Sequence, residues 1–368
     1  MTAILIAKTE GEQVIDLIKN YSRQELLELR SNSKFTCPDC GNILYLKIGN
    51  IKIPHFAHKS HSDCDSYSES ESSLHLQGKI LLHKFFTAKN FKVELEKYMP
   101  EIRQRADLLV DSRTVIEFQC SAISAHDVVR RTAAYKAVGL YPTWIFGNNE
   151  KPENRIQVIH LMEYQKKMLI NHEHTKYLLL LNPSTGQFTY YSNLFFISGN
   201  RWVGKISSLP ANKQTFPFAV PKRLGRKDFE TMYSVFALAR TAFIRSQLFA
   251  KNRYQNPFWL LCYKLGLDIR NVPATIGVPI AGAECIAEHA VIWQLKTVRA
   301  LEQGKSVSDL ISSMKIKLSN KGDAAQLEKV MQDYTSFIHY MAGQNNDCER
   351  QMEGLYDIYC KRVRKLRK

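Results

Sequence analysis

Apolar residues recur along the middle of the chain with two different periods, one typical of helices and one of strands. A helix is predicted over about residues 70–89 by apolar positions at helical spacing, which are Leu74, Leu81, Leu82, Phe85 and Phe86. Three strand-like segments follow, then a second helix and one more strand. Their predicted ranges are 91–98, 102–110 and 114–120 for the three strands, 125–138 for the helix and 141–146 for the last strand.

The pattern changes on both sides of this region. Toward the N-terminus it predicts a short strand, an amphipathic helix and then a Cys- and His-rich stretch, followed by a polar connector at residues 65–73. Beyond residue 150 a hairpin is predicted over 177–191, and from about Arg226 the chain is mostly helical. We therefore expect three domains, with the boundaries 1–66, 67–150 and 151–368.

The charge of the chain favours a polyanionic partner. Its 51 Lys and Arg residues against 35 Asp and Glu residues give a formal net charge of +16, and nucleic acid is the first candidate for such an excess. No apolar run approaches the ~18 residues that a membrane span needs, and the first residues do not form a signal peptide. We therefore expect a cytoplasmic protein without a membrane span, whose cysteines are mostly reduced.

A cluster of Cys and His residues predicts a structural zinc site. Cys37 and Cys40 form a Cys-x-x-Cys turn followed by Gly41, and a hairpin around residues 49–50 would return a His pair to that turn. Zn²⁺ prefers four tetrahedral nitrogen or sulfur ligands, and a site closed by four protein ligands is structural. The predicted ligands are Cys37, Cys40, His58 and Cys64, with His55 or His61 as alternatives to His58.

Two carboxylates and an amide interrupt the apolar strands at 102–110 and 114–120. By strand alternation Glu117 and Gln119 share one face, and Asp107 can meet Glu117 if the two strands pair. Two carboxylates held close repel each other unless a cation lies between them, and Mg²⁺ prefers such oxygen ligands. Residues along one face of the preceding helix could face the same cleft. These residues are Glu71, His75 and Lys79.

The order of these elements, with an Asp and a Glu on the second and third strands, resembles the core of the PD-(D/E)xK nucleases. The segments "CPDCGNILYLKIGNIKIPHFAH", "ESSLHLQGK", "RADLLV", "VIEFQCS" and "RRTAAYKAVGLYPTWIF" resemble, in this order, the competence protein CoiA family of naturally transformable Gram-positive bacteria. The resemblance covers about residues 1–150. It implies an α/β fold: a PD-(D/E)xK restriction-endonuclease-like core with an N-terminal zinc-ribbon-like module and a mostly helical C-terminal domain.

The resemblance also implies roles for single residues. Asp107 and Glu117 would be the catalytic metal ligands for Mg²⁺ or Mn²⁺, and Glu71 would be a helix carboxylate that some members add. Gln119 stands where these nucleases usually carry a Lys. A Gln cannot supply a positive charge, although it can hydrogen-bond a water, and some active nucleases of this fold carry Gln there. Lys79 or Lys136 could replace the missing cation.

The predicted function is a metal-dependent DNA nuclease that processes incoming or recombining DNA during transformation, acting on single-stranded or branched DNA. Basic residues near the site are expected to contact DNA: Lys79, Arg103, Arg105, Arg130, Arg131 and Lys136. The alternative is a catalytically inactive DNA-binding accessory protein that assists the RecA recombinase and other competence proteins. A third interpretation, a zinc-stabilised scaffold that does not touch DNA, fits poorly with the charge of +16.

Overall fold

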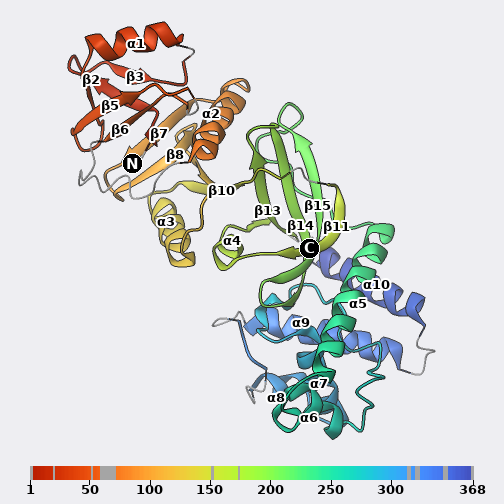
Figure 1. Cartoon of the computed structure of the whole chain (residues 1–368). Coiled ribbons are helices and arrows are strands. Elements are labelled where there is room, and N and C mark those ends of the chain that lie inside the picture. Colours follow the sequence, from red (N-terminus) through yellow and green to blue (C-terminus); the bar gives the residue numbers. More distant parts are fainter. Residues whose placement is uncertain are drawn as a thin grey trace.

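Two separate β-sheets carry the first 210 residues, and a group of helices carries most of the rest (Figure 1). The structure is a computed structural model, and it describes residues 3–19, 21–50, 53–58, 72–150, 153–172, 175–312, 316–319, 324–342 and 347–365. The mixture of helices and strands confirms the predicted α/β class. Among the helices within these ranges, none is both long and apolar enough to cross a membrane.

The N-terminal sheet has six short strands in the order β1-β6-β5-β4-β2-β3. Its strands are β1 (Ala3–Ile4), β2 (Ile6–Thr9), β3 (Val14–Asp16), β4 (Phe35–Thr36), β5 (Ile43–Lys47) and β6 (His55–His58). The helix α1 (Arg23–Asn32) begins after Ser22, whose hydroxyl accepts a hydrogen bond from Glu25 N while the Glu25 carboxylate accepts one from Ser22 N. This capping box explains why the predicted helix starts where it does. The small core of this module includes Leu26, Phe35 and Phe56.

The second sheet has nine strands. Two helices lie beside the four strands that come first in the chain. The helix α2 (Ser73–Thr87) precedes three antiparallel strands, and α3 (Ala125–Ala137) precedes a strand that pairs in parallel with β9. These strands are β7 (Val93–Met99), β8 (Gln104–Val110), β9 (Thr114–Gln119) and β10 (Tyr141–Gly147). The predicted order of helix, three strands, helix and strand is confirmed.

The hairpin of β8 and β9 lies between the two helices. Its turn contains Asp111 and Ser112, both in the left-handed region with φ of 48° and 52°, as tight hairpins require. Side chains then alternate between the two faces. Leu108, Ile116 and Phe118 join the apolar side chains of α2, whereas Leu109 and Val115 pack with Tyr135 of α3. Burial on both faces explains why the polar residues of this hairpin stand out in the sequence.

The sheet continues past residue 150, where the sequence predicts a domain boundary. Strand β13 pairs with β10 in parallel, and the order is β11-β15-β14-β13-β10-β9-β8-β7, with β12 paired to β13. The further elements are β11 (Arg155–His160), α4 (Glu163–Lys167), β12 (Ile170–His172), β13 (Thr175–Asn182), β14 (Gln187–Ser198) and β15 (Arg201–Pro210). The hairpin predicted over 177–191 is confirmed as β13 and β14.

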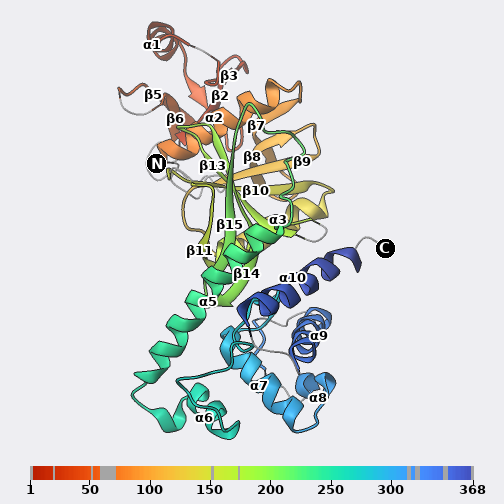
Figure 2. The ribbon, with the colours of Figure 1, turned by 90° about the vertical axis from the view of Figure 1, so that its right-hand side faces the viewer.

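Helices dominate from residue 226 onward, as the sequence predicts. They are α5 (Arg226–Leu248), η1 (Arg253–Gln255), α6 (Pro257–Lys264), η2 (Ala283–Cys285), α7 (Ala290–Glu302), α8 (Val307–Ser312), α9 (Ala324–Met341) and α10 (Cys348–Lys365). Their core is built on large buried rings, among them Phe236, Trp293 and Tyr334. Figure 2 shows that α5 leads away from the second sheet and that α6 lies at the far end of the molecule from α1.

Some predicted features lie outside the described residues. Among the predicted site residues these are Glu71 and Cys64, and the alternative zinc ligand His61 is a third. Most of the polar connector at 65–73 and the last three residues are outside as well.

Gly78 allows α2 to lie directly on β9. A Cβ at this position would lie 1.8 Å from Cε1 of Phe118, whose ring is buried with 1% of its surface exposed. The close approach holds the neighbouring helical residues His75 and Lys79 against the sheet, where they contact polar groups of β7 and β8.

We expect Gly78→Ala to destabilise the protein. Ala is the better helix former by about 1 kcal/mol, but an added methyl group in a filled core costs about 1–3 kcal/mol and here meets an immobile ring. The matched control is Gly225→Ala, where an added Cβ meets nothing within 4 Å. Chemical denaturation measures both variants, and equal free energies of unfolding would contradict the described contact.

Candidate active site and metal centre

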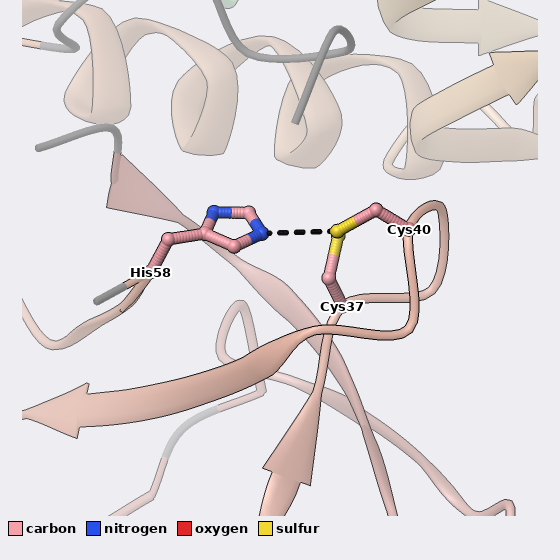
Figure 3. A group of neighbouring side chains, drawn as sticks. All are labelled: Cys37, Cys40 and His58. Carbon is pink, nitrogen blue, oxygen red and sulfur yellow. Dashed lines mark hydrogen bonds between the residues drawn. The ribbon is translucent and has the colours of Figure 1, made fainter. Parts of the chain in front are cut away.

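The Cys-x-x-Cys turn and strand β6 bring three potential metal ligands together (Figure 3). The sulfur atoms of Cys37 and Cys40 and one ring nitrogen of His58 all lie within 4.8 Å of one another, and Cys40 Sγ lies 3.4 Å from His58 Nε2. The turn is closed by a hydrogen bond from Gly41 N to Cys37 O, with Gly41 at a φ of 71°. In the part of the chain that the structure describes, this is the only such group of three or more Cys, His, Asp or Glu residues.

The donor set of this group is that of a tetrahedral metal site. Two thiolates and one imidazole suit Zn²⁺ well. Burial lowers the pKa of His58, which favours the neutral ring that a metal requires. His55 does not belong to the group, and its Nδ1 lies 2.8 Å from the carbonyl oxygen of Ile53. The fourth predicted ligand, Cys64, lies outside the described residues.

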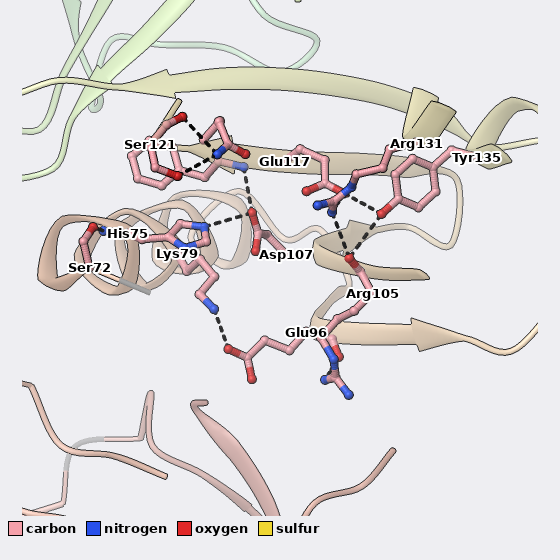
Figure 4. A network of polar contacts seen from close by, with 12 residues as sticks. Ser72, His75, Lys79, Glu96, Arg105, Asp107, Glu117, Ser121, Arg131 and Tyr135 are labelled. Carbon is pink, nitrogen blue, oxygen red and sulfur yellow. Dashed lines mark hydrogen bonds and ion pairs between the residues drawn. The ribbon is translucent and has the colours of Figure 1, made fainter. Parts of the chain in front are cut away.

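Asp107 lies where the ladder between β8 and β9 stops. The last paired residues are Leu108 and Ile116, and the next backbone N–H of β9 that needs a partner, that of Phe118, donates to Asp107 Oδ2 at 2.8 Å. The same oxygen lies 3.2 Å from Nε2 of His75 on α2 (Figure 4). The carboxylate of Asp107 therefore replaces a ladder hydrogen bond and is fixed from two sides.

Glu117 is held by two side chains of α3. Its Oε1 accepts a hydrogen bond of 2.6 Å from the guanidinium of Arg131 and another from the hydroxyl of Tyr135 (Figure 4). Both donors also reach the carbonyl oxygen of Arg105 at 3.2 Å, so that one helical turn of α3 joins β8 to β9. The carboxylate is almost completely buried, with 3% of the side chain exposed.

The two carboxylates have pKa values shifted in opposite directions. Burial, together with the nearby charge of Asp107, raises the pKa of Glu117 to about 7, although Arg131 and the Tyr135 hydrogen bond act against this. Burial would also raise the pKa of Asp107, but the charge and hydrogen bond of His75, with the charge of Lys79, hold it well below its usual range. Close, buried like charges of this kind leave one carboxylate readily protonated in the absence of a cation.

One oxygen of each carboxylate remains for another ligand. Asp107 Oδ1 and Glu117 Oε2 accept no hydrogen bond from any residue in the described ranges. Two carboxylate oxygens on neighbouring strands, each with its other oxygen fixed, suit a hard divalent cation. The residues present therefore fit a Mg²⁺ or Mn²⁺ ion, held by Asp107 and Glu117.

Gln119 has a different orientation from the one that the sequence suggests. Its amide Nε2 donates to the carbonyl oxygen and to the hydroxyl of Ser121, both at 3.1 Å. The side chain is 7% exposed at the end of β9 and is thus fixed toward the loop that leads to α3. Glu71, the other residue expected here, lies outside the described residues.

The basic residues expected to contact DNA fall into two groups. Arg103, Arg130 and Lys136 are exposed. The other three are held by protein partners, which is at odds with the expected phosphate contacts: Lys79 is paired with Glu96, Arg105 with Asp39, and Arg131 with Glu117. Burial explains the difference, because a charged side chain in the protein interior is costly without an opposite charge beside it.

Sequence reasoning missed Arg131 and Tyr135 as partners of Glu117. The sequence predicts Arg131 as a DNA contact, whereas the structure places its guanidinium on Glu117. The spacing of four residues between Arg131 and Tyr135, which puts them on one face of a helix, was the available signal. A carboxylate predicted inside a buried strand requires donors, and the helix that follows the strand is the nearest source of them.

A buried polar network joins the Cys-x-x-Cys turn to the strand of Asp107. Asp39, inside the Cys-x-x-Cys turn, forms an ion pair with Arg105, and the guanidinium of Arg105 also donates to the carbonyl oxygen of Glu96 at 2.5 Å. Burial lowers the pKa of Arg105 to about 10, although Cys37 and Asp107 act in the opposite direction. Arg105 lies two residues before Asp107, so the strand that the turn contacts is the strand that carries the Asp107 carboxylate.

A second link runs through Glu96 of β7. Its Oε2 accepts the backbone N–H of Leu5 at 3.1 Å, and its Oε1 forms a 2.5 Å ion pair with Lys79. Both side chains of this pair are 1% exposed. The N-terminal sheet is thereby attached to the helix that carries His75.

A buried pair of carboxylates lies on adjacent central strands between two helices, and the comparison with known proteins assigns this region to a nuclease-like domain. The family model "Competence protein CoiA, nuclease-like domain" matches residues 71–223, and "Competence protein CoiA, N-terminal domain" matches residues 18–67. The chain belongs to the CoiA family of competence proteins. It is 26% identical to the Competence protein CoiA of Bacillus subtilis (strain 168) over 268 residues, which are 71% of this chain and 70% of that protein. No solved structure matches the chain significantly.

We expect Lys79→Met to lower the free energy of unfolding by about 3–5 kcal/mol, because the buried Glu96 carboxylate loses the charge beside it. The double variant Lys79→Met/Glu96→Gln should recover much of this loss, since a Gln at position 96 has no charge to bury and can still accept the Leu5 N–H. Urea denaturation measures these differences.

The exposed pair of Lys97 and Glu94, with side chains 45% and 33% exposed, supplies the control. Lys97→Met should change stability by less than about 1 kcal/mol. A double variant no more stable than Lys79→Met would show that the buried charge is not the cause.

Proposed function

We propose that this chain is a Mg²⁺- or Mn²⁺-dependent DNA nuclease with a PD-(D/E)xK-type core. The observation that carries the proposal is the buried pair of Asp107 and Glu117, each with one oxygen fixed by the protein and one left for a cation. The match to a nuclease-like family domain supports the same conclusion. The name of the Bacillus subtilis relative supports a role in competence, on DNA taken up during transformation.

In this proposal Asp107 and Glu117 hold the ion, and the remaining residues keep the two carboxylates in place. The ion, when bound, supplies a Lewis acid for a phosphate oxygen and lowers the pKa of an attacking water. His75 orients Asp107, while Arg131 and Tyr135 orient Glu117. Glu71, which lies outside the described residues, is proposed as a further carboxylate.

The exposed cations near the site are proposed to hold the DNA backbone. Arg103 lies in the turn before β8, and Arg130 and Lys136 lie on α3. Such contacts position a strand without reading its sequence, so we propose that the enzyme recognises DNA structure, single-stranded or branched, rather than base sequence. The net charge of +16 supports a partner of this kind.

We propose that the Cys37, Cys40 and His58 group binds a structural zinc ion, with Cys64 as fourth ligand. A six-stranded sheet of two- to five-residue strands has little core of its own, and a metal can supply the missing stability. The ion pair between Asp39 and Arg105 then transmits the position of the metal-bound turn to β8.

A second candidate function is that of a DNA-binding accessory protein without catalysis, acting with the recombinase. The specific observation in its favour is Gln119, which replaces a Lys and donates to Ser121. The charge of the buried Lys79 acts on Asp107 and could compensate for the missing cation.

We expect the purified protein to cut a panel of single-stranded, duplex and branched DNAs when Mg²⁺ or Mn²⁺ is added. Asp107→Ala and Glu117→Ala should each reduce cutting by about 10²-fold or more, because the cation loses one of its two protein ligands. Glu101→Ala removes an exposed carboxylate from the turn before β8 and is the matched control, which should cut normally. Binding without cutting by the wild type would favour the accessory function.

We expect one zinc ion per chain by elemental analysis. Cys37→Ser, Cys40→Ser and Cys64→Ser should each lose it and unfold the N-terminal sheet at lower temperature, whereas Cys348→Ser, at an exposed cysteine of α10, should keep the metal. Retention of a full zinc equivalent by Cys64→Ser would show that another residue closes the site, with His61 the first to test.

A further inference from the structure

The end of the helical part away from the two sheets exposes three aromatic rings. Phe249, which follows α5, is 85% exposed, Tyr254 in η1 is 92% exposed and Tyr263 in the last turn of α6 is 86% exposed. These are the three most exposed large hydrophobic side chains in the described structure. We call residues 245–264 the aromatic tip, and Figure 2 places it at the far end of the molecule from β8 and β9.

The aromatic tip is ordered by side chains other than these three rings. The Asn256 side chain caps α6 through the backbone N–H of Phe258 at 2.8 Å, and its amide donates to Gln247 Oε1 at 3.0 Å. Trp259 Nε1 donates to the carbonyl oxygen of Gln247 at 2.8 Å. Phe258, with no exposed surface, anchors the helix in the core. The exposed rings therefore contribute little to folding, and their exposure needs another explanation.

The aromatic tip is strongly positive. Residues 231–267 contain no Asp or Glu. Four exposed cations belong to this stretch: Arg245, Lys251, Arg253 and Lys264. None of them forms an ion pair with any carboxylate in the described part of the chain. The guanidinium of Arg253 lies 4.7 Å from the ring centroid of Trp259, so it is held near the surface by a ring rather than by an acid.

We propose that the aromatic tip is a second nucleic-acid site, which binds single-stranded DNA by stacking bases on the three rings and pairing phosphates with the four cations. Single-stranded DNA binds to exposed rings interspersed with cations, because each base has a face that can stack on a ring. Each phosphodiester also carries a negative charge. Two of the three rings carry hydroxyls, and the intervening Asn252 and Gln255 are polar and exposed. Such a surface suits a hydrated DNA strand better than a lipid surface. The proposal does not depend on catalysis at Asp107 and Glu117.

The test is a binding titration of zinc-loaded protein, without added Mg²⁺, against a labelled oligothymidylate followed by fluorescence anisotropy. The triple variant Phe249→Ala/Tyr254→Ala/Tyr263→Ala should bind about tenfold or more weakly, from the loss of up to three stacking platforms. Its thermal unfolding should match the wild type. The control is Tyr141→Ala on β10, which removes a ring that is 58% exposed and also has a cation, Arg113, 5.1 Å from its centroid; its affinity should not change.

Two further measurements separate stacking from charge. An abasic oligonucleotide of equal length should bind the wild type and the triple variant equally, because it offers phosphates without bases. Lys251→Ala/Lys264→Ala should lower the slope of log affinity against log salt by about 0.7 for each lost phosphate contact.

Unchanged binding of oligothymidylate by the triple variant would overturn the proposal. So would a preference of the wild type, but not of the triple variant, for vesicles of anionic phospholipid over oligothymidylate, which would assign the tip to a membrane surface. Asp107→Ala distinguishes this site from the proposed nuclease: it should keep the full affinity of the tip, so failure of either proposal leaves the other intact.

Discussion

The repulsion between two buried carboxylates is the constraint on which the second sheet depends. Asp107 and Glu117 lie on neighbouring central strands, and each charge inside the protein is expensive unless donors surround it. The neighbouring elements supply those donors. Helix α2 brings His75, the backbone of β9 brings the Phe118 N–H, and α3 brings Arg131 and Tyr135. The positions of both helices therefore follow from the need to supply donors to these two carboxylates.

The need of buried charges for partners also explains how the N-terminal sheet is attached to the second sheet. Arg105 and Glu96 lie on β8 and β7. Each has a partner from the N-terminal residues, which are Asp39 in the Cys-x-x-Cys turn and the backbone N–H of Leu5. Such contacts are directional, so they fix how the two sheets meet in a way that apolar packing alone does not. The cluster of Cys37, Cys40 and His58 is thus coupled to the carboxylate pair through only a few residues.

Several parts of this arrangement could be predicted from local pattern. The order of elements from α2 to β10 follows from periodicity and turn residues, and the position of α1 follows from the Ser22 cap. Asp107 and Glu117 were recognisable because a strand of apolar residues has no ordinary use for a carboxylate. The metal cluster was recognisable because Cys-x-x-Cys fixes its geometry within four residues. In each case the pattern lies within a short stretch of sequence, which can adopt few alternative conformations.

The partners of the charged residues could not be predicted in this way. The sequence alone determined which strands carry carboxylates, where the cysteines converge and that the protein carries an excess of positive charge. Only the tertiary structure decided that Lys79, Arg105 and Arg131 face carboxylates rather than solvent, and that the sheet continues through β13 beyond residue 150. The physical reason is that an ion pair or a parallel strand pairing joins residues far apart in the chain. Whether a cation is buried depends on which elements pack over it, and periodicity within one element does not contain that information.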